Sequence, residues 1–228
     1  YVSFSQSDDS EQKRLLESSV SHYNVVLDNA KGSKLLDQAL SGIVLALCEL
    51  GRKSEAKKYA ERIQNENSRN DSIAWCLEGE EQIRHYQKIA EESLNDFIYR
   101  LRLAPATMES CEAIEKVLAI LFPDGNYQYY HSALQYSSCT KAMLLCREFR
   151  FDEAIEALKK AKYHAEEMTK YSKKTEYRFT TPLFNRVAGE KPATDSTVTD
   201  VDEFRDCLTN NRIFDSIRDR EDFKELYL

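Results

Sequence analysis

Apolar side chains recur every three or four residues over most of the chain, which is the spacing of one face of an α-helix. Between residues 34 and 50 the steps are four, three, four and three, at positions Leu36, Leu40, Ile43, Leu47 and Leu50. The alternation of apolar and polar residues that indicates strands is nearly absent. The pattern therefore predicts an all-α protein.

Breaks in this pattern divide the chain into predicted helices. Pro105 ends one long helical stretch, Thr107 can cap the next helix, and Gly79 is the expected site of a break or kink. The polar run 65–70 is expected to end the helix before it. The expected helices cover residues 8–30, 34–50, 54–67, 71–103, 107–122, 127–147, 151–173, 201–210 and 219–228.

Residues 180–200 show no apolar period and contain Pro182, Gly189 and Pro192. Residues 179–184 are apolar enough to pack, so we expect a helical domain over 1–184 and a linker or loop over 185–200. Residues 201–228 then form a helical cap on the domain. Its expected buried side chains are Phe204, Leu208, Phe214, Ile217, Phe223 and Leu226.

One sequence pattern occurs twice, at residues 46–60 and 142–158. In each copy an apolar helix ends, a short connection follows, and a second helix opens with Glu-Ala, at Ala56 and Ala154. A small side chain at that position lets two helices pack closely as an antiparallel hairpin. A hairpin cannot bury its apolar face alone, so the pattern predicts an α-solenoid whose concave surface is free to bind a ligand.

These two hairpins resemble tetratricopeptide repeats. The resemblance rests on the small residue Ala142, the turn glycine Gly51 and the helix-opening alanines Ala56 and Ala154. The later copy departs from the family in having Phe149 where glycine is usual. The resemblance implies a tetratricopeptide-like solenoid that binds peptides or proteins.

A second resemblance covers more of the chain. The segments 79–87, 121–127 and 179–183, with the later hairpin between the last two, look like the C-terminal region of bacterial Xre-type helix-turn-helix regulators. This resemblance implies a DNA-binding domain before Tyr1. It also implies that the chain is the sensing or dimerising half of the regulator.

Net charge argues against direct contact with DNA. The chain has 32 Lys and Arg against 39 Asp and Glu, a net charge of −7 and a pI near 5.3. This is the wrong sign for a surface that neutralises phosphates, so DNA is expected as a partner only through the upstream domain. No apolar run is long enough to cross a bilayer and no signal segment opens the chain, so we expect no membrane contact and a cytoplasmic location.

No arrangement of residues predicts chemistry. The four histidines lie singly on predicted helices, the six cysteines show no CxxC pair, and the six glycines form no phosphate-binding loop. We therefore expect reduced cysteines and no catalytic residue, metal or cofactor, so the chain is not predicted to be an enzyme. A helical enzyme with an unrecognised site stays an alternative, as does a stand-alone scaffold for protein partners.

Tyrosine is frequent, at 13 residues, and clusters around the later hairpin. Tyrosine anchors peptides at low entropic cost. The expected lining of a ligand groove is Asn126, Tyr127, Tyr130, Gln135 and Tyr136. The expected partner is a peptide or protein, with a homodimer left open.

The lysines between residues 159 and 174 favour a solvated helix face over a contact surface.

Overall fold

The computed structural model describes residues 6–190 and 198–227. Helix accounts for 74% of the structure, which confirms the all-α prediction. The sheet in these residues has two antiparallel strands, β1 (Glu176–Arg178) and β2 (Ala188–Glu190), with Tyr177 opposite Gly189. The chain divides into two units, Tyr1–Ile89 and Ala90–Leu228.

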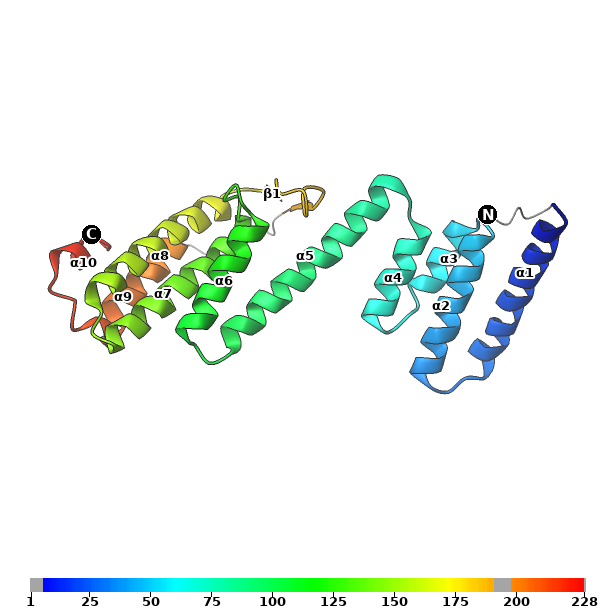
Figure 1. The fold of residues 1–228 in the computed structure, drawn as a ribbon, viewed down its shortest axis with the longest axis horizontal. Coiled ribbons are helices and arrows are strands. Elements are labelled where there is room, and N and C mark those ends of the chain that lie inside the picture. The colour runs from blue at the N-terminus through cyan, green and yellow to red at the C-terminus, as the bar shows by residue number, and fades with distance from the viewer. Residues whose placement is uncertain (1–5, 191–197, 228) are drawn as a thin grey trace. The chain divides into compact units, whose positions relative to one another are not determined.

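The first unit contains α1 (Gln6–Asn29), α2 (Ser33–Glu49), α3 (Lys53–Ala60) and α4 (Glu66–Cys76), followed by the start of α5 (Gly79–Leu103). In Figure 1, α1 runs antiparallel to α2, which in turn packs on α3 and α4. The apolar stripe predicted between residues 34 and 50 supplies much of the core of this unit. The buried side chains include Ile43, Val44, Leu47, Ala56 and Ala60.

The predicted helix over residues 54–67 is wrong at its C-terminal end. Helix α3 ends at Ala60, and the polar run starts α4 instead of only ending a helix. The Asn65 side chain caps α4 by accepting a hydrogen bond from the Ser68 backbone N–H at 2.9 Å. The Asp37 carboxylate of α2 accepts the backbone N–H groups of Gln64 and Asn65, both at 2.8 Å. A long-range contact therefore stabilises a turn where local composition predicted helix.

The predicted break near Gly79 is confirmed. Helix α4 ends at Cys76 and α5 begins at Gly79, which has a φ of 55°. The stop before Pro105 is also confirmed, since α5 ends at Leu103.

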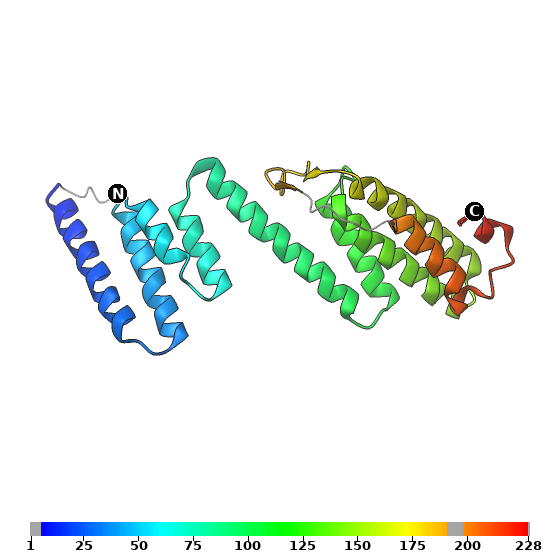
Figure 2. The ribbon, with the colours of Figure 1, turned by 180° about the vertical axis from the view of Figure 1, so that it is seen from behind.

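The second unit begins within α5 and contains α6 (Met108–Leu121), η1 (Gln128–Tyr130), α7 (His131–Arg147), α8 (Phe151–Ser172), α9 (Asp200–Asn210), η2 (Arg212–Phe214) and α10 (Glu221–Lys224). Helix α7 packs against α6 on one side and pairs with α8. Figure 2 shows α9 alongside this hairpin, where it contacts α8.

The connections α2–α3 and α7–α8 have the same backbone geometry. The Arg52 N–H donates to the Leu47 carbonyl at 2.8 Å, and the Arg150 N–H donates to the Leu145 carbonyl at 2.9 Å. In each turn the preceding residue is left-handed: Gly51 at φ 75° and Phe149 at φ 60°. This is the Schellman way of ending a helix. The sequence similarity between the two hairpins thus corresponds to a shared turn.

Alanine lies where the helices of each hairpin approach. Ala56 of α3 and Ala142 and Ala154 of the α7–α8 hairpin are all 0% exposed. The predicted role of these small residues in close packing is confirmed.

Residues 179–184 pack as predicted, in an aromatic core of the second unit. Phe179 and Phe184 are buried against Phe122 and Tyr130. The expected loop over 185–200 is partly structured, since Val187 is buried and β2 follows it. Residues 191–197 lie outside the described part of the chain.

The predicted cap packs on the α7–α8 hairpin. Its second helix is shorter than expected, because α10 covers only Glu221–Lys224 and η2 precedes it. The six predicted apolar side chains are all buried, at 0–5% exposure: Phe204, Leu208, Phe214, Ile217, Phe223 and Leu226. Within residues 6–190 and 198–227, no helix has the length and apolar character needed to cross a membrane.

Candidate functional site

A cavity of about 520 Å³ opens on the second unit between α6, α7, α8 and the start of α10. This volume is in the range of ligand pockets in proteins. Its lining is charged as well as apolar. The lining residues are Glu115, Ser138, Lys141, Leu145, Asp152, Glu153, Ile155, Glu156, Ala157, Lys160, Arg220 and Asp222.

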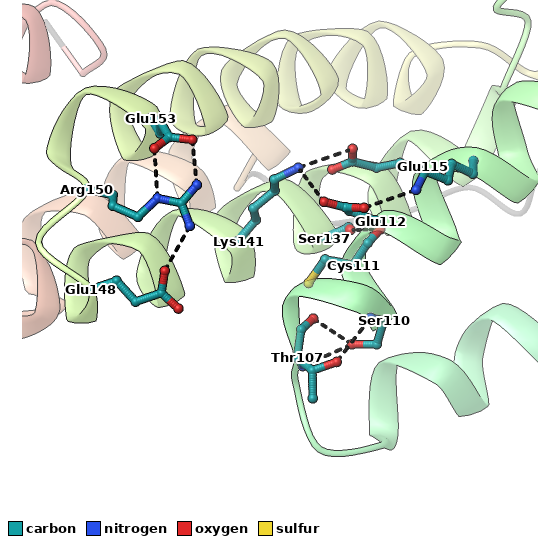
Figure 3. A network of polar contacts seen from close by, with 11 residues as sticks. Thr107, Ser110, Cys111, Glu112, Glu115, Ser137, Lys141, Glu148, Arg150 and Glu153 are labelled. Carbon is teal, nitrogen blue, oxygen red and sulfur yellow. Dashed lines mark hydrogen bonds and ion pairs between the residues drawn. The ribbon is translucent and has the colours of Figure 1, made fainter.

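Hydrogen bonds at the start of α6 and between α6 and α7 position the two helices that form one wall of the cavity. Thr107 and Ser110 form a capping box that fixes the first turn of α6. The buried Ser137 hydroxyl of α7 donates to the Cys111 carbonyl of α6 at 2.9 Å. Figure 3 shows both contacts beside the side chains that α6 and α7 present to each other. The two helices therefore hold Glu115 in a defined position.

Lys141 projects from α7 toward two carboxylates of α6 (Figure 3). Its Nζ is 3.9 Å from Glu115 Oε2 and 4.0 Å from Glu112 Oε1. These distances give electrostatic attraction but exceed the usual length of a hydrogen bond. The Lys141 side chain is 24% exposed and that of Glu115 is 25% exposed, so both are half-buried.

The other carboxylate oxygen of Glu115, Oε1, is fully buried and has no hydrogen-bond partner among the described residues. Leaving a buried acceptor unpaired costs roughly 1–3 kcal/mol, and more for a charged group. Because this oxygen has no accessible surface, a molecule in the cavity does not reach it, and its cost lies within the fold.

The rim of the cavity is predominantly acidic. The whole lining contains five carboxylates and three cationic side chains. Arg220 is the best-anchored cation, because its guanidinium contacts Asp152 at 2.7 Å and Asp222 at 2.8 Å. The Arg220 hydrogen bond also lowers the pKa of the Asp222 carboxyl. This arrangement ties the C-terminal segment to the start of α8.

Arg150 fixes the end of the rim at the α7–α8 turn. Its guanidinium lies between Glu148, at 2.9 Å, and Glu153, at 2.7 Å (Figure 3). The hydrogen bond from Arg150 lowers the pKa of Glu153. Glu153 therefore stays ionised near neutral pH.

No protein-family model, curated protein or solved structure matches this chain. The two resemblances seen in the sequence stay predictions.

A second cavity, of about 750 Å³, lies in the first unit. It is lined by α2 and the start of α4, and its carboxylate is Asp37. Both oxygens of Asp37 already accept backbone N–H groups. The cavity between α6 and α8 is the stronger candidate, because the α7–α8 hairpin with its repeat-like turn borders it.

Two residues of the predicted groove stabilise the fold. Tyr130 is 2% exposed and its hydroxyl donates to Glu91 Oε1 at 2.9 Å, so its prediction as part of an open groove is wrong. Its aromatic neighbours enclose it in the core. The Asn126 amide donates to the Arg178 carbonyl at 3.2 Å and to the Thr180 hydroxyl at 2.8 Å. Asn126 thereby anchors the segment that follows β1.

The other three predicted residues are more accessible. Tyr127 and Gln135 are half-buried, and Tyr136 is 38% exposed. The Arg102 guanidinium lies over the Tyr136 ring at 4.6 Å from its centroid. The role of these three residues in binding stays a prediction.

The residues that line the cavity were missed in the sequence because their charges looked like those of solvated helix faces. Lys141 carried the one usable signal, since it is the charged residue in the otherwise uncharged stretch from Ser132 to Cys146. Among the lysines from 159 to 174, Lys159 and Lys170 are exposed and paired with carboxylates, at 2.7 Å and 2.6 Å, as expected of a solvated face. Lys160 lies on the cavity rim.

Two of the histidines that appeared isolated are in contact. His131 Nδ1 and His164 Nδ1 are 3.0 Å apart, with the rings of Tyr127 and Tyr163 beside them. Burial lowers the pKa of both imidazoles, that of His164 to about 4.

Within the described ranges no group of three or more potential metal ligands occurs. All six cysteines are free thiols.

Proposed function

We propose that the chain is the ligand- or protein-binding half of a helix-turn-helix transcription regulator. In this proposal its hairpins belong to a tetratricopeptide-like α-solenoid closed by the C-terminal cap. The observation that carries the proposal is the α7–α8 hairpin, in which a repeat-like turn and alanine packing border a charged cavity. A hairpin of this kind is a scaffold for binding.

The mechanism that fits this architecture is a shift between two conformations. The cavity walls come from α6, from the α7–α8 hairpin and from the segment that Arg220 anchors. A ligand that contacts all three favours the conformation in which they lie at the right spacing. Only a difference in affinity between two conformations can move their equilibrium, and an attached DNA-binding domain would then respond.

No reaction is part of this proposal. The partners are a peptide or protein ligand, a second copy of the chain, and DNA contacted through an upstream domain. The acidic net charge of −7 supports this division, because the chain itself is unsuited to phosphate contacts.

The test is to isolate the polypeptide that the native cell makes and to determine its intact mass, N-terminal sequence and DNA binding. We expect a product with a basic helix-turn-helix segment before Tyr1 that binds DNA. A native product that starts at Tyr1 and does not bind DNA would contradict the regulator proposal.

The second candidate is a stand-alone scaffold for protein partners. It is favoured by the same acidic cavity rim, which suits a protein ligand without any link to DNA. The experiment above separates the two candidates.

A further inference from the structure

We infer that Cys48 and Cys76 are a site of reversible disulfide formation that links α2 to α4 in the first unit. Both are free thiols in the structure, and their Sγ atoms lie 3.8 Å apart although 28 positions separate them in the chain. Neither residue lines the cavity of the second unit. The inference therefore stands apart from the proposed function and concerns a covalent modification of the chain.

The two sulfur atoms need little movement to bond. A disulfide is about 2.05 Å long, so the Sγ atoms must approach by roughly 1.8 Å from their van der Waals contact. Cys76 is the last residue of α4 and Leu77 after it is extended, so a shift of Cys76 breaks no following turn of helix. The Cys76 thiol donates to the Ser72 carbonyl at 3.2 Å, and this contact yields easily because a thiol is a weak donor. The sulfurs can therefore meet without unfolding α2 or α4.

The two thiols differ in their access to solvent. Cys48 is half-buried, so a small oxidant can reach it, whereas Cys76 is 8% exposed. Burial raises the pKa of both thiols, that of Cys76 to about 12. Lys53 opposes this effect at both thiols and Lys57 opposes it at Cys76, while Glu49 adds to it at Cys48. The thiolate is the reactive form, so Cys48 reacts first and the reaction speeds up as the pH rises.

A peroxide is the oxidant for this site. The Cys48 thiolate attacks one peroxide oxygen, the O–O bond breaks, hydroxide leaves, and Cys48 becomes a sulfenic acid. The Cys76 thiol then gives up its proton as its sulfur attacks the Cys48 sulfur, and the S–O bond breaks to release water. Two thiols and one hydrogen peroxide thus give one disulfide and two water molecules. A dithiol reductant reverses the modification by exchange and is itself oxidised to a disulfide.

The bond closes a loop that contains α3 and the turn before α4. A cross-link of this kind restricts the unfolded chain and so stabilises the folded one, and the effect grows with loop length. The disulfide is therefore expected to stabilise the first unit against unfolding.

The experiment treats the full chain with hydrogen peroxide, blocks the remaining thiols by alkylation, and maps disulfides by mass spectrometry of unreduced proteolytic peptides. We expect a cross-linked pair of peptides that contains Cys48 and Cys76 and that disappears after treatment with dithiothreitol. The absence of this pair overturns the inference. A cross-link found only between Cys139 and Cys207, a second pair of thiols in contact, overturns it as well.

The variant Cys76→Ser removes the thiol that closes the disulfide. We expect it to keep Cys48 as a sulfenic acid, which dimedone labels, whereas the unmodified chain gives several-fold less label at Cys48. Cys146→Ser is the matched control, because it removes a similarly buried thiol, 5% exposed, from the second unit. It should keep the cross-link of Cys48 to Cys76. Equal dimedone labelling of Cys76→Ser and the unmodified chain contradicts the second step.

A readout on the unmodified chain does not depend on how well the variants fold. Trp75 is the neighbour of Cys76, and its fluorescence follows unfolding of the first unit. Oxidation is expected to raise the midpoint of thermal unfolding seen by Trp75 by roughly 5–10 °C, and dithiothreitol should restore the original value. An unchanged or lower midpoint in the cross-linked chain contradicts the stabilising role of the disulfide.

Discussion

Phe149 has a backbone conformation that glycine adopts far more readily than any bulky residue. Its φ is 60°, and the residue is 79% exposed. Burial of the ring therefore offsets little of the free-energy cost of this backbone conformation. Its ring lies against that of Phe151, at 6.1 Å between centroids. The equivalent turn in the first unit uses Gly51, at φ 75°.

We expect Phe149→Gly to stabilise the second unit by about 1 kcal/mol, because it removes the left-handed strain of a non-glycine residue. The measurement is urea unfolding followed by circular dichroism. Phe149→Ala is the control, since it removes the ring but keeps the strain. If alanine stabilises as much as glycine, the ring and not the backbone is responsible.

Tyr130 binds a buried carboxylate in the core of the second unit. Glu91 is 4% exposed, and the Tyr130 hydroxyl donates to its Oε1 at 2.9 Å. We expect Tyr130→Phe to lower the free energy of unfolding by about 1.5–3 kcal/mol, the usual cost of losing a hydrogen bond to a charged group.

The control for this substitution is Tyr136→Phe. The Tyr136 hydroxyl donates to the Arg102 carbonyl at 3.3 Å from an exposed position. Its loss should change the unfolding free energy by less than about 0.5 kcal/mol. Equal effects of the two substitutions would contradict the role given to the buried contact.

Between elements, the contact of His131 with His164 joins the first turn of α7 to the middle of α8. At 3.0 Å one Nδ1 donates and the other accepts, which requires at least one neutral ring. Glu167 favours protonation of both rings, while Lys170 and Lys174 oppose it at His131. Burial is the larger influence and lowers both pKa values.

This contact predicts a pH dependence of stability. Because the folded pKa of His164, about 4, lies below its ordinary value of 6.5, the unfolded chain binds more protons between these two pH values. The stability contributed by the pair is present above pH 6.5 and falls with decreasing pH. The loss is at most about 1.4 kcal/mol per pH unit for one histidine.

The measurement is the unfolding free energy at pH 7 and at pH 5. His164→Gln should lose less stability over this interval than the unmodified chain. The exposed His22 gives the control, and His22→Gln should follow the unmodified chain. Identical pH dependence of all three proteins would show that the pair binds the same number of protons in the folded and the unfolded chain.

At the scale of the whole molecule, the division into two units predicts two unfolding transitions. Each unit has its own buried core, and the only tryptophan, Trp75, lies in the first. Separate cores allow separate cooperative transitions. Trp75 fluorescence therefore reports the first unit, whereas helical circular dichroism reports both.

We expect Tyr130→Phe to shift the circular dichroism transition of the second unit and to leave the Trp75 fluorescence midpoint nearly unchanged. The complementary variant is Leu47→Ala, which deletes a side chain that is 0% exposed in the first unit. It should lower the fluorescence midpoint, since such deletions cost about 2–5 kcal/mol. If both variants shift both signals equally, the chain unfolds as one cooperative unit.

Structural features that depend only on residues close together in the sequence could be predicted from the sequence. The helical class, the Thr107 cap, the break near Gly79 and the six buried residues of the C-terminal cap all follow from spacing or from short-range hydrogen bonds. The two hairpins belong to the same group, because a small alanine is a local signal in both and Gly51 signals the left-handed turn of the first. The shared geometry of their turns confirms that reading.

Features that join distant segments appear only in the tertiary structure. His131 meets His164 across 33 residues, and Tyr130 meets Glu91 across 39. Glu115, Lys141 and Arg220 line one cavity from three separate segments. The sequence by itself determined that the chain is helical and which helix faces are apolar, because both follow from local periodicity. Only packing decided which charges became buried and unpaired, since that depends on what each helix face meets.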